Sequence, residues 1–277
     1  MPDVSRFQVL KFDEKHSKHI EDEVVVEEPL EVRVNGESVS VTMRTPGDDF
    51  DLAAGLLWTE GFIRDPSEIG TIAFCPDEER PELKNIVNVT LAGCAEGPPP
   101  SPRARGQFRT SSCGLCGKGT LEELRQVCRP ITSDIAIPYD VVCTLPARLR
   151  AAQANFDRTG GIHAAGLFDA AGDSLLLRED LGRHNAVDKV LGAAFRSESI
   201  QFSKSILVVS GRLGFEIAQK ALIAGIPIVA SVSAPSSLAL DLANDFGMTS
   251  IGFLRGRSMN IYTHPHRIIH ALSEHPA

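Results

Sequence analysis

The amino-acid sequence predicts an α/β protein of two domains, a smaller α+β domain followed by a larger α/β domain. Strand-type alternation around a hairpin turn dominates residues 23–45, whereas short apolar strands alternate with helical segments after residue 205. A Pro- and Gly-rich stretch, residues 93–106, separates these regions. We therefore predict domains at residues 1–128 and 129–277.

The composition is that of an ordinary globular protein. The 277 residues are 43% hydrophobic and 23% charged, with a net charge of −8. This charge argues against nonspecific nucleic-acid binding, and no apolar run is long enough to predict a membrane span. The polar N-terminus does not resemble a secretory signal, and the six cysteines show no disulfide framework. We therefore expect a cytoplasmic protein.

In the smaller domain, Asn35-Gly36 is typical of a hairpin turn between the two halves of residues 23–45. Pro46-Gly47-Asp48-Asp49 ends the second strand and offers carboxylates to cap a helix over residues 50–63. A further strand is expected at Ile86–Leu91. The residues expected to face inward from the helix are Leu52, Leu56 and Trp58.

The stretch 93–106 contains three consecutive prolines and several glycines, which predicts an exposed loop. Thr120 and Glu123 then form a capping box, so a helix is expected from Leu121 that includes Cys128.

The larger domain is predicted to open with a hairpin, Ala164–Phe168 and Leu175–Arg178. Asn185 with Asp188 can cap the next helix. Its inward face is expected to hold Val187, Val190, Leu191, Ala194 and Phe195. Strands at 206–210, 226–232 and 249–254 then alternate with helices at 215–225 and 236–247, which predicts a parallel sheet buried on both faces.

Cys113 and Cys116 form a C-x-x-C pair in a Gly- and Ser-rich segment. Arg109, Lys118 and the positive end of the predicted helix would lower the thiol pKa toward neutrality, which suits attack on a donor persulfide. Cys116 could then resolve or share the sulfur. Three alternatives remain: a zinc knuckle completed by Cys128 and Cys143, a thioredoxin-like redox pair, and unreactive surface cysteines.

Loops after the three predicted parallel strands form a second candidate site. Ligands of open α/β sheets bind at the carboxyl ends of the strands, where helix N-termini attract phosphate. Small and hydroxyl residues there permit close backbone approach, and arginines can bind phosphate. The pattern favours a phosphorylated, nucleotide-like ligand, with ordinary turn chemistry as the alternative. The loops are Ser210–Glu216, Ser233–Ser237 and Phe253–Ser258.

The polar segment 178–189 precedes a helix and would place Arg183, His184 and Asn185 at its positive end. An anion or pyrophosphate site is one interpretation, and a helix cap with solvated charges is the other. His163, after a Gly-Gly bend, is expected to be structural.

Several long motifs together resemble the FdhD family, the formate dehydrogenase accessory sulfurtransferases. The resemblance runs from about Glu28 to about Pro265 and includes EEPLEVRVNG, RTSSCGLCGK, REDLGRHNAVDKVLG, AGIPIVASVSAPSSLA and GFLRGRSMNIYTHP. It implies a sulfur carrier with sulfurtransferase activity, in which a cysteine desulfurase loads a persulfide on Cys113. The sulfur would then pass to bis(molybdopterin guanine dinucleotide), the molybdenum cofactor of formate dehydrogenase.

The resemblance also implies a cytidine deaminase-like fold for the larger domain and a homodimer. A zinc deaminase is nevertheless rejected, because His163-Ala-Ala165 lacks the Glu of the H-x-E motif and the C-x-x-C lies upstream. A cofactor-binding chaperone without catalysis is the alternative function.

We accordingly predict Cys113 and Cys116 as the sulfur-carrying pair, no structural zinc, and GDP as a fragment that mimics the cofactor. The cofactor-binding residues are predicted to be Ser210, Gly211, Arg212, Ser233, Ser236, His184, Phe253, Leu254, Arg255, Gly256, Arg257 and Ser258.

Overall fold

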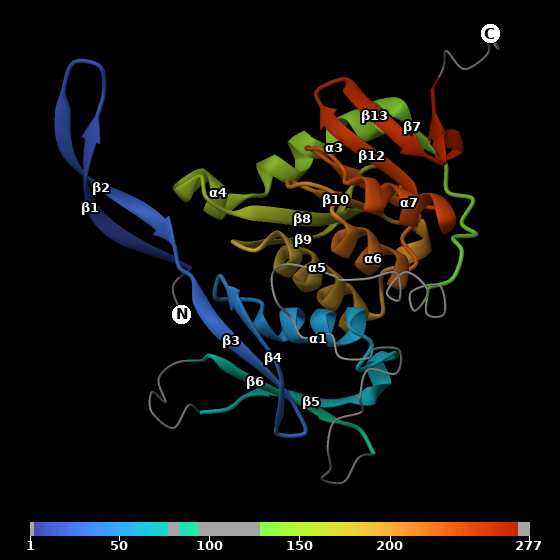
Figure 1. Ribbon diagram of the computed structural model, residues 1–277, viewed down its shortest axis with the longest axis horizontal. Helices are drawn as coiled ribbons and strands as arrows, with labels where there is room; N and C mark the ends of the chain where they lie inside the picture. The colour runs from blue at the N-terminus through green and yellow to red at the C-terminus, as the bar shows by residue number, and fades with distance from the viewer. Residues whose placement is uncertain (1–2, 77–83, 94–127, 271–277) are drawn as a thin grey trace.

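The computed structural model describes residues 3–76, 84–93 and 128–270, which form two α/β units (Figure 1). We call residues 28–91 the N-terminal unit and residues 137–269 the C-terminal unit. The mixed α/β class predicted from the sequence is confirmed. No helix in the described ranges is long and apolar enough to cross a membrane.

The chain opens with a long hairpin that the sequence did not predict. Strand β1 (Val4–Phe12) pairs antiparallel with β2 (Ser17–Val25), and the hairpin extends away from the rest of the molecule (Figure 1). Strand β2 therefore contributes nothing to the sheet of the N-terminal unit. Its Glu23 carboxylate contacts the Arg158 guanidinium at 2.8 Å, which ties the hairpin to the C-terminal unit.

The N-terminal unit is a four-stranded sheet covered on one face by helix α1 (Asp49–Thr59). The strand order is β4-β3-β6-β5, and the predicted turn at Asn35-Gly36 joins β3 to β4. Leu52 and Leu57 of α1 are fully buried against alternate residues of the sheet, as the helical and strand periodicities require. The remaining elements are β3 (Glu28–Val34), β4 (Glu37–Arg44), η1 (Pro66–Glu68), β5 (Ile69–Phe74) and β6 (Ile86–Leu91).

The C-terminal unit is built on a six-stranded sheet in the order β13-β12-β11-β10-β8-β9. Its central strands β10, β11 and β12 are parallel, as predicted, whereas the hairpin β8–β9 joins the same sheet antiparallel. The strands are β8 (His163–Phe168), β9 (Ser174–Asp180), β10 (Ile206–Val209), β11 (Ile228–Ser231), β12 (Thr249–Arg255) and β13 (Ser258–Thr263). Short strands β7 (Ile137–Pro138) and β14 (Ile268–Ile269) pair separately.

Helices cover both faces of this sheet, which explains why its central strands are buried along most of their length (Figure 1). One face packs against α3 (Tyr139–Ala151). The other packs against α5 (Arg183–Ser197), α6 (Phe215–Ile223) and α7 (Ser237–Asp245). The short elements are α4 (Ala154–Thr159), η2 (Phe202–Lys204) and η3 (Pro265–Arg267).

The two units meet where α1 packs against α5 (Figure 1). Two glycines allow this close approach. A Cβ atom added at Gly55 would lie 1.9 Å from the Asp188 carbonyl oxygen, and one at Gly192 would lie 1.9 Å from the Asp51 carbonyl oxygen. Neither position can therefore hold a larger residue without separating the helices.

Three local predictions were wrong. Helix α1 begins where expected, but Asp48 makes no cap hydrogen bond, and the Asp49 carboxylate instead binds the buried Arg44 at 2.8 Å. Helix α5 begins at Arg183, ahead of Asn185, because the chain turns at Gly182. Cys128 is buried, as a small apolar side chain would be, but it lies outside any helix.

Candidate functional site

Three helix N-termini of the C-terminal unit converge on one pocket of about 470 Å³. The first turn of α5, the first turn of α6 and the start of α7 each contribute to its wall. We call this the helix-terminus pocket. Its lining residues are Arg183, His184, Arg212, Leu213, Gly214, Phe215, Glu216, Ala234, Pro235, Ser236 and Leu238.

Two of these helix ends leave their backbone N–H groups available. Gly182 before α5 and Gly214 before α6 have no side chain, so neither residue can cap the helix that follows it. Ser236 does cap α7, because its hydroxyl accepts a hydrogen bond from the Ala239 N–H at 3.3 Å. Helix N-termini carry partial positive charge, so the pocket is suited to an anion.

Two arginine side chains add to this positive character. Arg183 and Arg212 line the pocket, and the His184 Nε2 atom lies 2.6 Å from the Glu216 carboxylate. The His184 imidazole holds the pKa of Glu216 below its ordinary value of 4.5. Glu216 is thus ionised near neutral pH, and a bound anion would compete with it for His184.

The first two predicted loops form this pocket together. The Leu213 N–H donates to the Ala234 carbonyl oxygen, and the Ser236 N–H to the Leu213 carbonyl oxygen. Of the predicted residues, His184, Arg212 and Ser236 line the pocket, whereas Ser210, Gly211 and Ser233 lie in the same loops outside its lining. The part that each plays in binding stays a prediction.

The third loop forms the tight turn between β12 and β13. It adjoins the second loop, because the Phe253 N–H donates to the Ser233 carbonyl oxygen at 3.0 Å and Arg255 Nε to that of Val232 at 2.9 Å. Arg257 turns toward α3 instead, where it pairs with Asp140 at 2.5 Å and Tyr139 donates to its carbonyl oxygen. Phe253, Leu254, Gly256 and Ser258 likewise lie outside the pocket lining.

His163 lies next to the pocket, at the start of β8. Its Nδ1 atom is 3.4 Å from the Ser210 hydroxyl, which also accepts the Ala164 N–H at 2.9 Å. Burial, and secondarily the charge of Arg183, lower the pKa of His163 below its ordinary value of 6.5. This side chain is therefore neutral at physiological pH.

Three charges of the segment 178–189, on Asp180, Asp188 and Lys189, are buried and paired rather than solvated, whereas Arg183 and His184 are half-buried at the pocket and their role stays a prediction. Lys189 binds Asp180 at 2.8 Å, and both side chains are almost fully buried. Asp188 binds Lys220 of α6 at 2.8 Å, and burial raises the pKa of this aspartate while Lys220 opposes the rise. Arg178 binds Asp51 of α1 at 2.9 Å. Most of this segment therefore holds the two units together.

The Cys113–Cys116 pair, Arg109, Lys118 and the helix expected from Leu121 lie outside the described residues. The zinc-knuckle alternative can be examined through its other two ligands. Cys128 packs in the cluster beneath α5, α6 and α7, whereas Cys143 lies on α3, across the sheet. These two thiols cannot bind one ion, and no cluster of potential metal ligands occurs among the residues with described positions.

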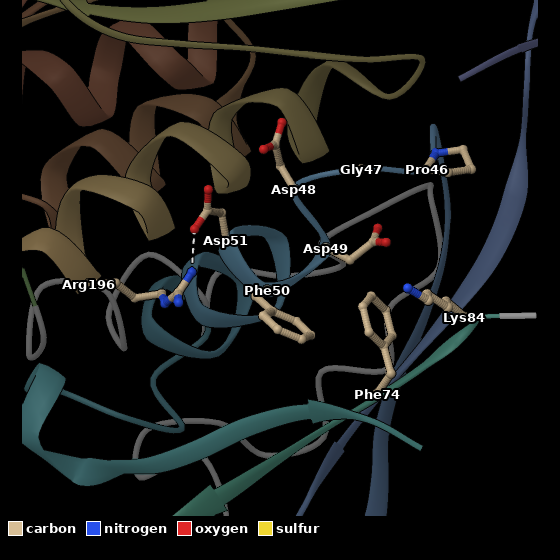
Figure 2. Close-up of a pocket in the computed structure, with 9 residues that line it drawn as sticks. All are labelled: Pro46, Gly47, Asp48, Asp49, Phe50, Asp51, Phe74, Lys84 and Arg196. Atoms are coloured by element: carbon tan, nitrogen blue, oxygen red, sulfur yellow. Dashed lines mark hydrogen bonds and ion pairs between the residues drawn. The ribbon is translucent and has the colours of Figure 1, made fainter. Parts of the chain in front are cut away.

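A second pocket, of about 370 Å³, lies at the N-terminus of α1 (Figure 2). The rings of Phe50 and Phe74 contact each other with centroids 4.8 Å apart, and Arg196 reaches Asp51 at 2.6 Å. Lys84 lies over the Phe74 ring. The buried carboxylates Asp49 and Asp51 are already paired with arginines and are less available to bind a ligand. We therefore favour the helix-terminus pocket as the functional site.

The contact between His184 and Glu216 was not foreseen from the sequence. The two residues are 32 positions apart and lie on different helices, so no local spacing could reveal it. The contact between His184 and Glu216 could be anticipated only from a prediction that α5 and α6 begin at the same edge of one sheet.

Comparisons with known proteins agree with this architecture. A solved structure described as a putative formate dehydrogenase accessory protein from Desulfotalea psychrophila superposes with a TM-score of 0.77 at 25% identity, and covers 97% of this chain and 100% of that one. The two chains therefore share one overall fold.

The sequence comparisons identify the family. The model of the FdhD/NarQ family matches residues 25–269. A sulfur carrier protein FdhD from Streptomyces avermitilis is 50% identical over 252 residues, 89% of each chain. Its namesake from Sulfolobus acidocaldarius is 39% identical over 265 residues, 96% of this chain and 98% of that one. The chain belongs to the FdhD/NarQ family.

Proposed function

We propose that this protein is a sulfurtransferase that carries persulfide sulfur on Cys113 from a cysteine desulfurase to a molybdenum cofactor destined for formate dehydrogenase. The cofactor would be bis(molybdopterin guanine dinucleotide), bound as a substrate. Support comes from the relatives named sulfur carrier proteins and from the solved accessory protein. The structural observation that carries the proposal is the convergence of three helix N-termini and two arginines on one pocket.

The proposed loading step is a thiolate exchange. The Cys113 thiolate attacks the terminal sulfur of the desulfurase persulfide, a new S–S bond forms at Cys113, and the desulfurase thiolate leaves. Electrons balance without an added oxidant, because one S–S bond replaces another. In the delivery step the Cys116 thiolate would attack the Cys113 sulfur and form a Cys113–Cys116 disulfide, which releases the outer sulfur to the cofactor as sulfide, so the two thiols supply both electrons.

The helix-terminus pocket would hold the phosphates of a guanine nucleotide portion. Each helix N-terminus favours an anion by roughly 0.3–1 kcal/mol. Arg183 and Arg212 can each add charge-assisted hydrogen bonds of about 1.5–3 kcal/mol. The adjoining loop Phe253–Ser258 would contact another part of the same cofactor. Additional features that we propose are a cytidine deaminase-like topology for the C-terminal unit, a homodimer and a cytoplasmic location.

Mass spectrometry tests the carrier role. After incubation with a cysteine desulfurase and cysteine, the wild-type protein should gain the mass of one sulfur, and Cys113→Ala should not. The same variant should fail to restore formate dehydrogenase activity in cells that lack the protein, whereas Cys116→Ala should lose less. If Cys113→Ala restores full activity, the non-catalytic cofactor chaperone becomes the better explanation.

Calorimetry tests the nucleotide site. GDP should bind the wild-type protein more tightly than ADP does, and Arg183→Ala and Arg212→Ala should each weaken GDP binding about tenfold or more, given the energies above. The double variant Arg255→Ala, Arg257→Ala tests whether the third loop reaches the same ligand. Unchanged GDP affinity in both single variants would rule out the helix-terminus pocket as the phosphate site.

A further inference from the structure

We propose that Asp180, a buried carboxylate remote from the cysteine pair in sequence, is a positioning residue for the helix-terminus pocket. It would set the orientation of Arg183 and His184. It would also make that orientation depend on how the N-terminal unit packs against the C-terminal unit. This inference rests on the proposed function of the pocket as an anion site.

Asp180 holds both ends of the turn that presents Arg183 and His184 to the pocket. Its Oδ1 atom accepts the Gly182 N–H at 2.8 Å and the Asn185 side-chain amide at 3.1 Å. Gly182 immediately precedes Arg183, and Asn185 immediately follows His184. The dipeptide that lines the pocket thus lies between two residues anchored to one oxygen atom.

The other carboxylate oxygen connects this turn to the N-terminal unit. Asp180 Oδ2 accepts the Thr45 N–H at 3.2 Å and lies 2.8 Å from the Lys189 ammonium. Lys189 in turn donates to the Thr45 carbonyl oxygen at 2.9 Å. Thr45 follows the last residue of β4, so the end of that strand and the start of α5 are joined by one buried cluster. We call this cluster of Asp180, Lys189 and Thr45 the hub.

Further hydrogen bonds make the connection rigid. The Asn185 amide also donates to the Met43 carbonyl oxygen at 2.7 Å, and the Leu181 N–H donates to the Thr45 hydroxyl at 3.1 Å. Asp180 is fully buried and Lys189 is 1% exposed. These hydrogen bonds fix the position of the Asp180 carboxylate. Because the carboxylate also binds both ends of the Arg183–His184 turn, it restricts the movement of that turn.

The arrangement also explains why glycine stands at position 182. A Cβ atom there would lie 3.0 Å from the Asn185 amide nitrogen and 3.4 Å from Asp180 Oδ1. A methyl group would therefore press against the two side chains that hold the turn.

The test uses the full chain with GDP and inorganic pyrophosphate as separate probes. Asn185→Ala removes one anchor and leaves the Asp180–Lys189 pair intact, so it should remain folded. Asp180→Ala combined with Lys189→Met removes the hub without leaving a buried unpaired charge. Both should bind each probe about tenfold more weakly, which corresponds to about 1.4 kcal/mol. The backbone amide resonances of Arg183 and His184 should shift in both variants before ligand is added.

Arg267→Met is the control, because it removes another buried cation, whose guanidinium binds the Ser133 and Gly247 carbonyl oxygens and the Thr249 hydroxyl. It should lose thermal stability but keep wild-type affinity. Wild-type affinity in both Asp180 and Asn185 variants would overturn the inference, as would an equal loss in the control. Failure of the wild-type protein to bind either probe would instead refute the pocket as the anion site.

Discussion

The surroundings of the His163 imidazole change its pKa. Burial and the neighbouring Arg183 lower its pKa below 6.5, so the unfolded chain binds a proton at pH values where the folded protein does not. His163 therefore contributes stability that is present above pH 6.5 and lost as the pH falls below that value. We expect its NMR titration midpoint below 6.5.

The variant His163→Gln provides the corresponding stability measurement. Wild-type unfolding free energy should fall more steeply than that of the variant as the pH is lowered from about 6.5, the ordinary histidine value. The comparison must be made against His266→Gln, because His266 is an exposed histidine. Equal slopes for wild type and His163→Gln would show that this imidazole is not the source of the effect.

Arg257 illustrates what residue spacing could not reveal. Its position in a strand-end loop predicted a ligand contact, but its side chain pairs with Asp140, and both remain largely exposed at 75% and 72%. Solvent screens an ion pair this exposed, so it contributes little to stability. The residue types of the candidate loop could be read from the sequence, whereas the direction of the Arg257 side chain depends on Asp140, 117 positions away.

At the scale of elements, the contact between α1 and α5 depends on glycine. Alanine usually favours a helix over glycine by about 1 kcal/mol, so Gly55→Ala and Gly192→Ala would stabilise an isolated helix. Here the added methyl group would meet a backbone carbonyl oxygen at 1.9 Å. We expect each change to lower the free energy of unfolding by at least about 2 kcal/mol, because overpacking exceeds the propensity gain.

Chemical denaturation of the two variants measures this effect. Gly161→Ala is the control, because a methyl group there would meet only the Thr159 carbonyl oxygen, at 3.8 Å. It should change stability by less than about 0.5 kcal/mol. A neutral or stabilising result at Gly55 and Gly192 would mean that the helices are farther apart than described.

We expect the hairpin β1–β2 to be dispensable for both ligand binding and stability. An isolated two-stranded hairpin is marginally stable, and this one leaves Phe7 and Phe12 53% and 72% exposed. The family match begins at residue 25, where β2 ends. A chain that starts at Glu27 should therefore keep wild-type GDP affinity and lose little stability, because solvent screens the Arg158–Glu23 ion pair that ties the hairpin to the C-terminal unit.

Calorimetry and denaturation of the truncated chain provide the measurement. A loss of GDP binding would show that the hairpin supports the helix-terminus pocket.

Element prediction succeeded where periodicity and turn residues agreed. The Asn35-Gly36 turn, the hairpin β8–β9 and the parallel strands β10–β12 all followed from local pattern. The hairpin β1–β2 was not predicted, because its strands carry charged side chains on both faces and most of its side chains are exposed. The start of α5 was misplaced because its cap is a glycine fixed by Asp180, a tertiary contact rather than a local signal.

For the whole molecule, the sequence indicated two units but not how they join. The boundary predicted at residue 128 stays a prediction. The partly buried ion pair Arg178–Asp51 joins β9 to α1, and the buried pair Lys220–Asp188 of α6 and α5 binds the Thr59 hydroxyl of α1 through both of its members, at 2.9 and 3.0 Å. Breaking a buried pair typically costs about 3–5 kcal/mol. Separation of the units would expose several such charges at once.

The single tryptophan of the chain is a natural probe of this junction. Trp58 of α1 stacks on Phe195 of α5 with ring centroids 4.5 Å apart, and contacts Phe202 at 5.2 Å. Since the junction also contains buried ion pairs and glycine contacts, we expect the units to unfold together. Trp58 fluorescence and far-UV circular dichroism should then report one coincident urea transition. In Phe195→Leu, both transitions should move to lower urea together. If the fluorescence change precedes the loss of secondary structure, the units separate before either unfolds, and the ion pairs do not couple them.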